Sequence, residues 1–238
     1  MSSTTEKFIR LYEDLIEEVN RRAGASSSHS FEIERAASRD GAVRKRQNLL
    51  KYIRDVRHAV QHPKHRSNGY AVLISESFLE EVEGLLNHLQ NPLRSGSLGV
   101  PRKQIRTTHL SDRLGDLADE MRAGGFSNVP ILDEDDVIVG VFNETAIFHY
   151  LWHENETIVG RGMLVREVIE HCRLAANRTE TFRFVGPRVP LEDLADMFAP
   201  VESATTRLGA VFVTASGKDT ERLERLITPW DVLGGVIE

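Results

Sequence analysis

The sequence has almost no cysteine and no long apolar run. Its one cysteine, Cys172, excludes an internal disulfide and any zinc or redox site that needs two thiols. No apolar stretch reaches the roughly 18 to 20 residues of a membrane-spanning helix. The first residues, MSSTTEKFIR, also lack the apolar core of a secretory signal. From these absences we expect a cytoplasmic protein that has no membrane partner.

Several signatures of catalysis and metal binding are also missing. The sequence has no Walker phosphate loop, no GxGxxG turn and no GxSxG elbow, so it gives no support to nucleotide hydrolysis, dinucleotide redox chemistry or serine-hydrolase chemistry. The pairs His58/His62 and His149/His153 have the i,i+4 spacing of a helical metal site, but neither has an HExxH sequence or a carboxylate ligand set. We predict no bound metal and no required cofactor.

The 238 residues fall into two halves with different patterns. Residues 1–92 are predicted to be mostly helical. The stretch 93–104, LRSGSLGVPRKQ, contains Gly, Ser and Pro without periodicity and predicts a linker. Beyond it, short β-rich runs alternate with helices. The predicted fold class is therefore α+β, with an all-α helical bundle over 1–92 and an α/β part over 105–238.

The spacing of apolar residues predicts the individual elements. In the first half we expect helices over 6–22, from Phe31 to about Gln61 with a break at Gly41 left open, and from Ser77 to Asn91, and an extended piece at 70–74. In the second half the predicted helices are 111–123, 143–152 and 190–198, and the predicted strands are 128–132, 137–142, 181–185, 208–214 and 223–228.

Basic side chains gather in one segment of the helical half. Residues 35–66 contain 10 Lys or Arg and only two acidic residues, Asp40 and Asp55. At 100° per residue, Lys51, Arg54 and Arg57 share one helix face. Such a face is typical of a polyanion footprint, and RNA is the partner it predicts, although a solvated helix surface gives the same pattern.

The second half repeats itself. The run LGDLADEM that begins at Leu114 recurs as LEDLADMF at Leu191, 77 residues later, and each copy is followed by two β-rich runs. A single copy is too small to close a hydrophobic core. We therefore expect the two copies to bury their faces against each other.

These repeats resemble the CBS-domain family over about residues 100–238. The first copy contains SNVPILD and VGVF within 127–142, and the second ends in LITPWDV at 226–232, similar to the family's Thr/Ser-x-x-Asp ending. The resemblance implies a tandem pair of β-α-β-β-α units, with repeats over 105–160 and 161–238. It also implies a regulatory ligand that contains adenosine. AMP, ADP or ATP is preferred, while S-adenosylmethionine and a cyclic dinucleotide stay open.

The same resemblance implies a ligand site in the second repeat, in which Thr228 contacts phosphate, Asp231 accepts hydrogen bonds from ribose hydroxyls, and Phe184 and Val185 flank the base. The residues agree independently, because Thr228 is a suitable helix N-cap and a helix N-terminus attracts anions. A plain capped helix that binds nothing is the alternative.

The first repeat departs from this pattern. Asn143 and Ala146 stand where the hydroxyl residue and the aspartate of the family would be. We therefore expect one occupied nucleotide site per chain.

The helical half contains RHAVQH at 57–62, which resembles the Arg-x(4–6)-His motif of HEPN domains, and the resemblance extends over about 6–92. It implies a metal-independent ribonuclease in which His62 is the base and Arg57 binds the phosphorane charge. His58 replaces the polar residue that usually follows the arginine and would be a second proton donor. In the alternative, Arg57 and His62 only solvate the helix end.

Taken together, the sequence predicts a nucleotide-sensing regulatory protein, a homodimer by resemblance to both families. In one hypothesis the CBS pair controls a HEPN-like ribonuclease. In the other, the helical half is a non-enzymatic dimerisation or partner-binding module.

Overall fold

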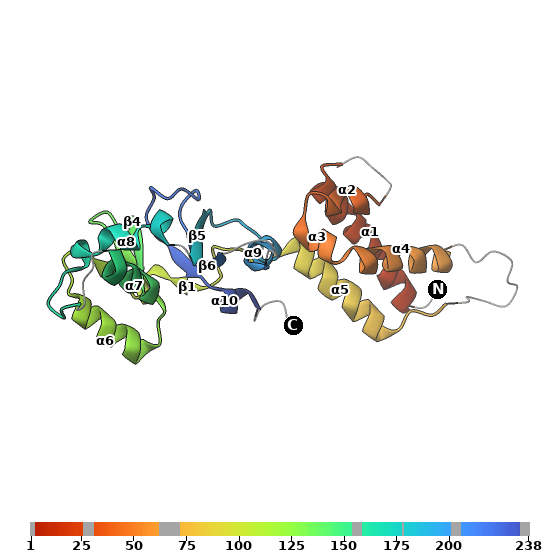
Figure 1. Cartoon of the computed structure of the whole chain (residues 1–238). Coiled ribbons are helices and arrows are strands. Elements are labelled where there is room, and N and C mark those ends of the chain that lie inside the picture. The colour runs from red at the N-terminus through yellow and green to blue at the C-terminus, as the bar shows by residue number, and fades with distance from the viewer. Residues whose placement is uncertain are drawn as a thin grey trace, which may run out of the picture. The chain divides into compact units, whose positions relative to one another are not determined.

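The computed structural model describes residues 3–25, 31–61, 72–153, 159–177, 179–200 and 206–233. The chain divides into two compact units, Met1–Leu93 and Arg94–Glu238. The first is helical and the second contains all the strands of the described residues (Figure 1), so the predicted combination of N-terminal helices with a C-terminal sheet region is confirmed. No helix within the described ranges is both long and apolar enough to cross a membrane.

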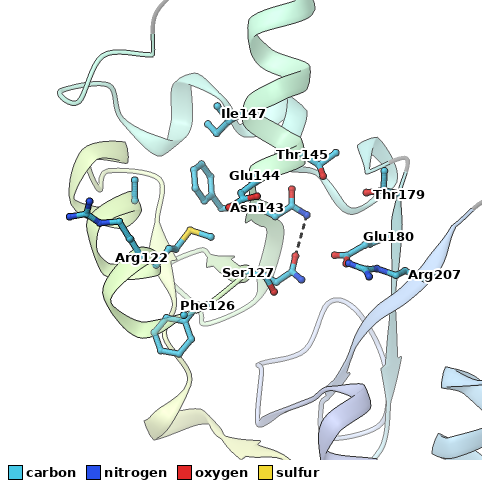
Figure 2. Close-up of a pocket in the computed structure, with 15 residues that line it drawn as sticks. Arg122, Phe126, Ser127, Asn143, Glu144, Thr145, Ile147, Thr179, Glu180 and Arg207 are labelled. Carbon is cyan, nitrogen blue, oxygen red and sulfur yellow. Dashed lines mark hydrogen bonds and ion pairs between the residues drawn. The ribbon is translucent and has the colours of Figure 1, made fainter.

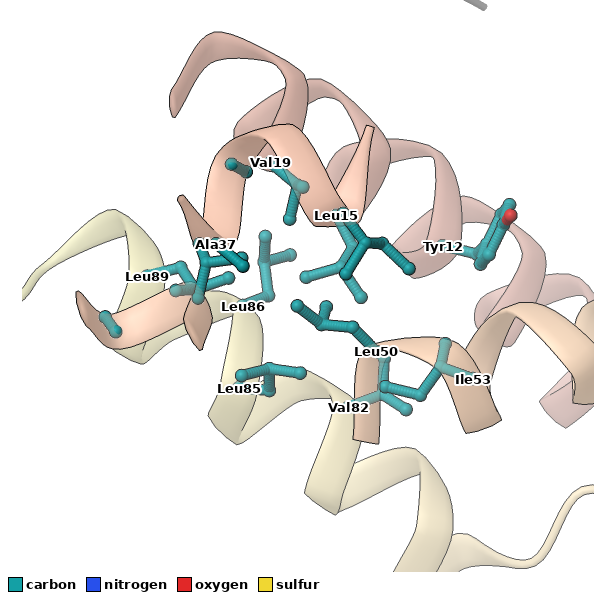
Figure 3. Close-up of a cluster of buried hydrophobic side chains, with 14 of the residues drawn as sticks. Tyr12, Leu15, Val19, Ala37, Leu50, Ile53, Val82, Leu85, Leu86 and Leu89 are labelled. Carbon is teal, nitrogen blue, oxygen red and sulfur yellow. The ribbon is translucent and has the colours of Figure 1, made fainter. Parts of the chain in front are cut away.

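The N-terminal unit packs its helices around one apolar core. The helices are α1 (Ser3–Ala23), α2 (Ile33–Ala37), α3 (Gly41–Lys45), α4 (Gln47–Gln61) and α5 (Glu76–Gln90). Leu15 from α1, Leu50 from α4 and Leu86 from α5 point toward one another in this core (Figure 3). Burial of such side chains stabilises a fold by about 1.5 to 3 kcal/mol each.

The helix predicted from Phe31 to Gln61 is broken into three. Asp40 has extended backbone angles and its carboxylate accepts a hydrogen bond from the Val43 amide at 3.1 Å, so it caps a new helix, α3. Arg46, at the end of α3, also leaves helical geometry before α4 begins. The break at Gly41 that the sequence left open is therefore present, and the capping carboxylate explains it.

The last helix of the unit begins one residue earlier than predicted, at Glu76. Ser75 is its N-cap, because its hydroxyl accepts a hydrogen bond from the Phe78 amide at 3.2 Å. The extended piece predicted at 70–74 lies partly outside the described residues, and residues 72–75 form no strand.

A buried charge network ties α1, α3 and α5 together. The side chain of Arg22 is 8% exposed, and its Nε donates to Glu18 Oε1 at 2.7 Å. Its other nitrogens donate to the Asp40 carboxylate and the Leu89 carbonyl. Arg21 donates to the same Glu18 from the solvent side. Burial alone would raise the pKa of Glu18, but the hydrogen bonds from Arg21 and Arg22 outweigh it and hold that pKa below its ordinary value.

The C-terminal unit alternates strands and helices. Its elements are β1 (Val100–Pro101), β2 (Thr108–His109), α6 (Leu114–Gly124), β3 (Asn128–Leu132), β4 (Ile138–Asn143), α7 (Glu144–His153), α8 (Ile169–Cys172), β5 (Glu180–Val185), α9 (Leu191–Phe198), β6 (Arg207–Val213), β7 (Arg225–Ile227) and α10 (Pro229–Leu233), with short 3-10 turns at Arg102–Gln104, Val165–Glu167 and Leu174–Ala176.

These elements form the same unit twice. In the first, β2 is parallel to β3 and β3 is antiparallel to β4; in the second, β5 is parallel to β6 and β6 is antiparallel to β7. Helices α6 and α9 follow the first strand of each unit, and α7 and α10 follow the last. Leu132, Ile138 and Val141 of the first unit share an apolar cluster with Ala210, Phe212 and Leu223 of the second. The two copies therefore bury their faces against each other, as the repetition predicts.

The predicted linker at 93–104 differs from the structure, because residues 94–101, which we call the strap, belong to the second repeat. Ser95 is fully buried, and its hydroxyl donates to the Gly186 carbonyl at 2.7 Å and accepts from the Val189 amide at 3.2 Å. The strap ends in β1, which pairs with β7 and makes a four-stranded sheet of order β1-β7-β6-β5. Backbone hydrogen bonds, which leave no apolar periodicity in the sequence, hold this segment.

Candidate ligand site

A cavity of about 710 Å³ lies where the two repeats meet (Figure 2). One wall comes from α6 and the turn before β3, a second from the end of β4 and the start of α7, and a third from the starts of β5 and β6. The residues that line it include Met121, Arg122, Phe126, Asn143, Glu144 and Arg207.

Asn143 fixes the start of α7 at this cavity. Its side chain is 4% exposed, its Oδ1 accepts a hydrogen bond from the Ala146 amide at 2.9 Å, and its Nδ2 donates to Asn128 Oδ1 at 3.1 Å. The residue that departs from the family pattern is thus a good N-cap. The N-terminus of a ten-residue helix, with its partial positive charge, therefore opens at the cavity.

Charged groups stand on opposite sides of the cavity. Arg122 of α6 lies on one side, and Arg207 of β6, with Glu180 of β5 beside it, lies on the other (Figure 2). Glu144, the first residue of α7, is exposed between them. The site therefore presents two guanidinium groups and two carboxylates, the groups that recognise phosphates and sugar hydroxyls.

Apolar side chains form another part of the cavity wall. Met121 and Phe142 are nearly buried, whereas Phe126 is half-exposed. Apolar walls with a few polar groups are the usual composition of small-molecule sites. The arrangement fits a ligand that has a flat apolar ring and an anionic group.

Thr228 and Asp231, the residues of the predicted ligand site, lie at the start of α10 and are hydrogen-bonded to each other. The amide and hydroxyl of Thr228 both donate to Asp231 Oδ2 at 2.7 Å, and α10 begins at Pro229 directly after this cap. The Asp231 carboxylate thus accepts both hydrogen bonds at the start of α10, and the Asp231 amide donates to the Thr228 carbonyl at 3.2 Å. Neither lines the cavity described above. A ligand role for Thr228 and Asp231 stays a prediction.

The two residues predicted to flank the base, Phe184 and Val185, lie on opposite faces of β5. Val185 is buried in the cluster with Leu191 and Val213, and Phe184 packs against Phe212 with ring centroids 5.4 Å apart. Both side chains therefore contribute to the core, and neither lines the cavity.

The residues of the predicted ribonuclease site are on α4 or just after it. His62 lies outside the described residues, and His58 is exposed. The Arg57 guanidinium lies 5.3 Å from the centre of the Tyr12 ring, and its Nε is buried with no hydrogen-bond partner among the described residues. Arg57 thus packs on α1 by a cation–π contact.

Sequence reasoning missed Glu180 and Arg207. Each is the charged residue at the start of an apolar strand run, and both runs belong to the second repeat. Parallel pairing of the two strands places them side by side, so this signal was present in the sequence. The opposite wall of the cavity comes from the first repeat, and only the packing of the repeats reveals it.

The chain was compared with protein families, curated proteins and solved structures. Residues 97–153 match the model of the CBS domain family. The comparison with curated proteins found no match.

Similar solved structures include CBSX2 from Arabidopsis thaliana in complex with AMP (16% identity, covering 60% of this chain and 96% of that chain, TM-score 0.43). Two others are a putative acetoin utilization protein, AcuB, from Vibrio cholerae (18%, 61% and 91%, TM-score 0.44) and the CBS domains of a transcriptional regulator from Streptococcus pneumoniae (17%, 60% and 98%, TM-score 0.40). The similarity to the CBS domain family is limited to residues 97–153, less than half of this chain.

Proposed function

We propose that the C-terminal unit binds an adenine nucleotide in the cavity between its repeats, and that the chain is a nucleotide-sensing regulatory protein. The observation that carries the proposal is the cavity itself, which adjoins the CBS match and has the size of small-molecule sites, roughly 300 to 1,000 Å³. Its apolar wall suits an adenine ring, and its arginines suit a phosphate. AMP, the ligand in the CBSX2 structure, is the first ligand to test.

The cavity is at the start of α7, in the repeat that we expected to lack a site. Asn143 supplies the helix cap there, and Glu144 is a carboxylate for ribose hydroxyls in the absence of an aspartate at Ala146. Thr228 and Asp231 remain a second candidate site for the same class of ligand. The two sites are separable by mutation because they share no residue.

A variant that fills the cavity tests the proposal. Ala118 lies on the exposed side of α6 and lines the cavity, whereas Ala123 is exposed on the same helix and does not line it. In calorimetric titrations of the full chain, we expect Ala118→Trp to weaken AMP binding at least about 100-fold, because the indole takes the volume of the ligand. Ala123→Trp should leave the affinity unchanged.

The same titrations with ADP, ATP, S-adenosylmethionine and a cyclic dinucleotide identify the preferred ligand, and Asp231→Ala tests the second site. If Asp231→Ala abolishes ligand binding and Ala118→Trp does not, the ligand binds at Thr228 and Asp231 and not in the cavity. If the parent protein binds none of these ligands, the proposal that it senses a nucleotide is wrong.

For the output we propose that the helical unit is a dimerisation or partner-binding module. Support comes from α4, whose basic groups already have partners. Lys51 pairs with Glu34 at 3.2 Å, Arg54 pairs with Asp55 at 3.4 Å, and Arg57 packs on Tyr12. Such contacts leave less positive charge for an RNA backbone. The homodimer expected from the sequence stays part of this proposal.

The rival output is a HEPN-type ribonuclease with Arg57, His58 and His62 in its site. If it is correct, the parent protein cleaves RNA without added metal, and His62→Ala abolishes cleavage because the base is lost, with no change in sedimentation. A gel assay with labelled single-stranded RNA measures the cleavage. A parent protein that leaves the RNA intact supports the non-enzymatic module.

A further inference from the structure

An ion pair forms part of the cavity wall at the start of β5 and β6. Glu180 and Arg207 are register partners in the parallel pairing of these strands. Arg207 Nε and Nη2 donate to the same oxygen, Glu180 Oε1, at 3.0 Å and 2.7 Å. The Glu180 side chain is 9% exposed, whereas the Arg207 side chain is 82% exposed. The pair thus anchors an exposed guanidinium to a buried carboxylate beside the cavity (Figure 2).

The surrounding residues are arranged to hold this carboxylate. Asn177 Oδ1 accepts hydrogen bonds from the amides of Thr179 and Glu180 at 3.1 Å and 2.9 Å, which fixes the backbone where β5 begins. Gly209 lies next to the carboxylate, and a Cβ there would come 2.8 Å from Glu180 Oε2. Gly209 therefore leaves room for the Glu180 carboxylate. This glycine lowers the stability of β6, because glycine weakens the interior of a strand.

Stability does not explain the arrangement. An ion pair whose cation is exposed contributes little to folding, and a buried carboxylate is costly to desolvate. What the arrangement does achieve is to fix the direction of Arg207. Glu180 uses two of the five N–H donors of the guanidinium, and the others lie on its exposed part beside the cavity.

We propose that Arg207 binds the phosphate of the nucleotide in this cavity, and that Glu180 is the positioning residue that orients it. This assignment rests on the proposed nucleotide-binding function. It adds that the site binds a phosphorylated ligand more tightly than the corresponding nucleoside. A guanidinium fixed in advance loses little entropy when it binds phosphate, which makes it a selective phosphate ligand.

The test compares AMP with adenosine in calorimetric titrations of the full chain. We expect Arg207→Gln to weaken AMP binding about 10- to 100-fold, the range of a hydrogen bond to a charged group, and to leave adenosine binding unchanged. Glu180→Gln should weaken AMP binding less and also spare adenosine, because Arg207 keeps its charge and loses its orientation. Arg183→Gln is the matched control, since Arg183 is exposed on β5 and does not line the cavity.

Arg207→Gln leaves Glu180 as an unpaired buried carboxylate, which could disturb the fold locally. The double variant Glu180→Gln/Arg207→Gln replaces both charges by neutral amides. It therefore tests the loss of AMP binding in a protein that has no unpaired buried charge. Equal weakening of AMP and adenosine in both variants, or no change in either, overturns the assignment of Arg207. If the parent protein binds neither ligand, the proposed nucleotide-binding function is wrong. If it binds AMP no more tightly than adenosine, only the assignment of Arg207 to the phosphate is wrong.

Discussion

Replacing Arg22 by alanine will lower the free energy of unfolding of the N-terminal unit by about 3 to 5 kcal/mol, the cost of breaking a buried ion pair by removing one partner. Arg22 is the cation between Glu18 and Asp40, and it also satisfies the Leu89 carbonyl near the end of α5. Its removal leaves the Asp40 carboxylate, whose side chain is 18% exposed, without its cation, and it leaves the nearly buried Glu18 with Arg21 alone. Three helices lose their common contact in one substitution.

Arg21→Ala is the matched control. Arg21 binds the same Glu18, but its side chain is 64% exposed, so its loss should cost less than about 1 kcal/mol. Urea titrations of the full chain, followed by hydrogen exchange of peptides from each unit, measure the unfolding of the two units separately. Equal effects of the two substitutions would contradict a buried network centred on Arg22.

The pH dependence of this effect has a definite sign. Because the pKa of Glu18 is lower in the folded protein than its ordinary value of 4.5, its interaction with the arginines contributes stability above pH 4.5. That contribution is lost as the pH falls through the folded pKa. The difference in stability between the parent and Arg22→Ala should therefore narrow in acid.

Gly99→Ala will destabilise the C-terminal unit by about 2 to 5 kcal/mol, from two effects that add. Gly99 has φ +65°, where a side chain costs about 1 to 2 kcal/mol. A Cβ would also lie well inside contact distance of the Leu226 carbonyl oxygen and 3.0 Å from the Ile227 Cα, so the backbone of β7 has to move. Forcing atoms into a packed region costs a further 1 to 3 kcal/mol or so.

Gly125→Ala separates these two effects. Gly125 has φ +68°, but a Cβ there would meet no heavy atom within 4 Å. We expect it to cost about 1 to 2 kcal/mol, the backbone strain alone. The same urea and hydrogen-exchange experiment measures both variants. If the two cost the same, the strap does not pack against β7 as tightly as described.

The longer strands of the repeats were predictable nearly to the residue, whereas the two-residue strands β1 and β2 were not predicted. The predicted runs 128–132 and 208–214 became β3 (Asn128–Leu132) and β6 (Arg207–Val213). Both are short apolar runs followed by a polar residue, and the last four residues of each strand are buried. The repetition added a second, independent signal for each element.

The strap was not predictable from local pattern. Its Gly, Ser and Pro residues look like a linker because neither a helix nor a regular strand has that composition. Its partners are backbone groups near Val189 and Leu226, over 90 residues away. Hydrogen bonds to such distant groups leave no period in the sequence.

The candidate site shows a similar limit. The cap formed by Thr228 and Asp231 was predictable, since a hydroxyl residue followed three positions later by a carboxylate has a local mechanism. A ligand site requires knowing which surfaces face each other. Arg122 and Arg207 line one cavity only because the repeats pack together, and no spacing in the sequence encodes that relation.

The pairing of β1 with β7 also affects the order in which the chain can fold during synthesis. Residues 100–101 leave the ribosome long before their partners at 225–226, yet the second sheet lacks its edge strand until those partners emerge. The N-terminal unit depends on contacts within its first 93 residues and can form early. Completion of the C-terminal unit must wait for β7, because closing such a distant pairing is slow and requires both ends. During that interval the strap is an unpaired segment next to a finished helical domain, which is the stage at which nascent chains most need protection from aggregation.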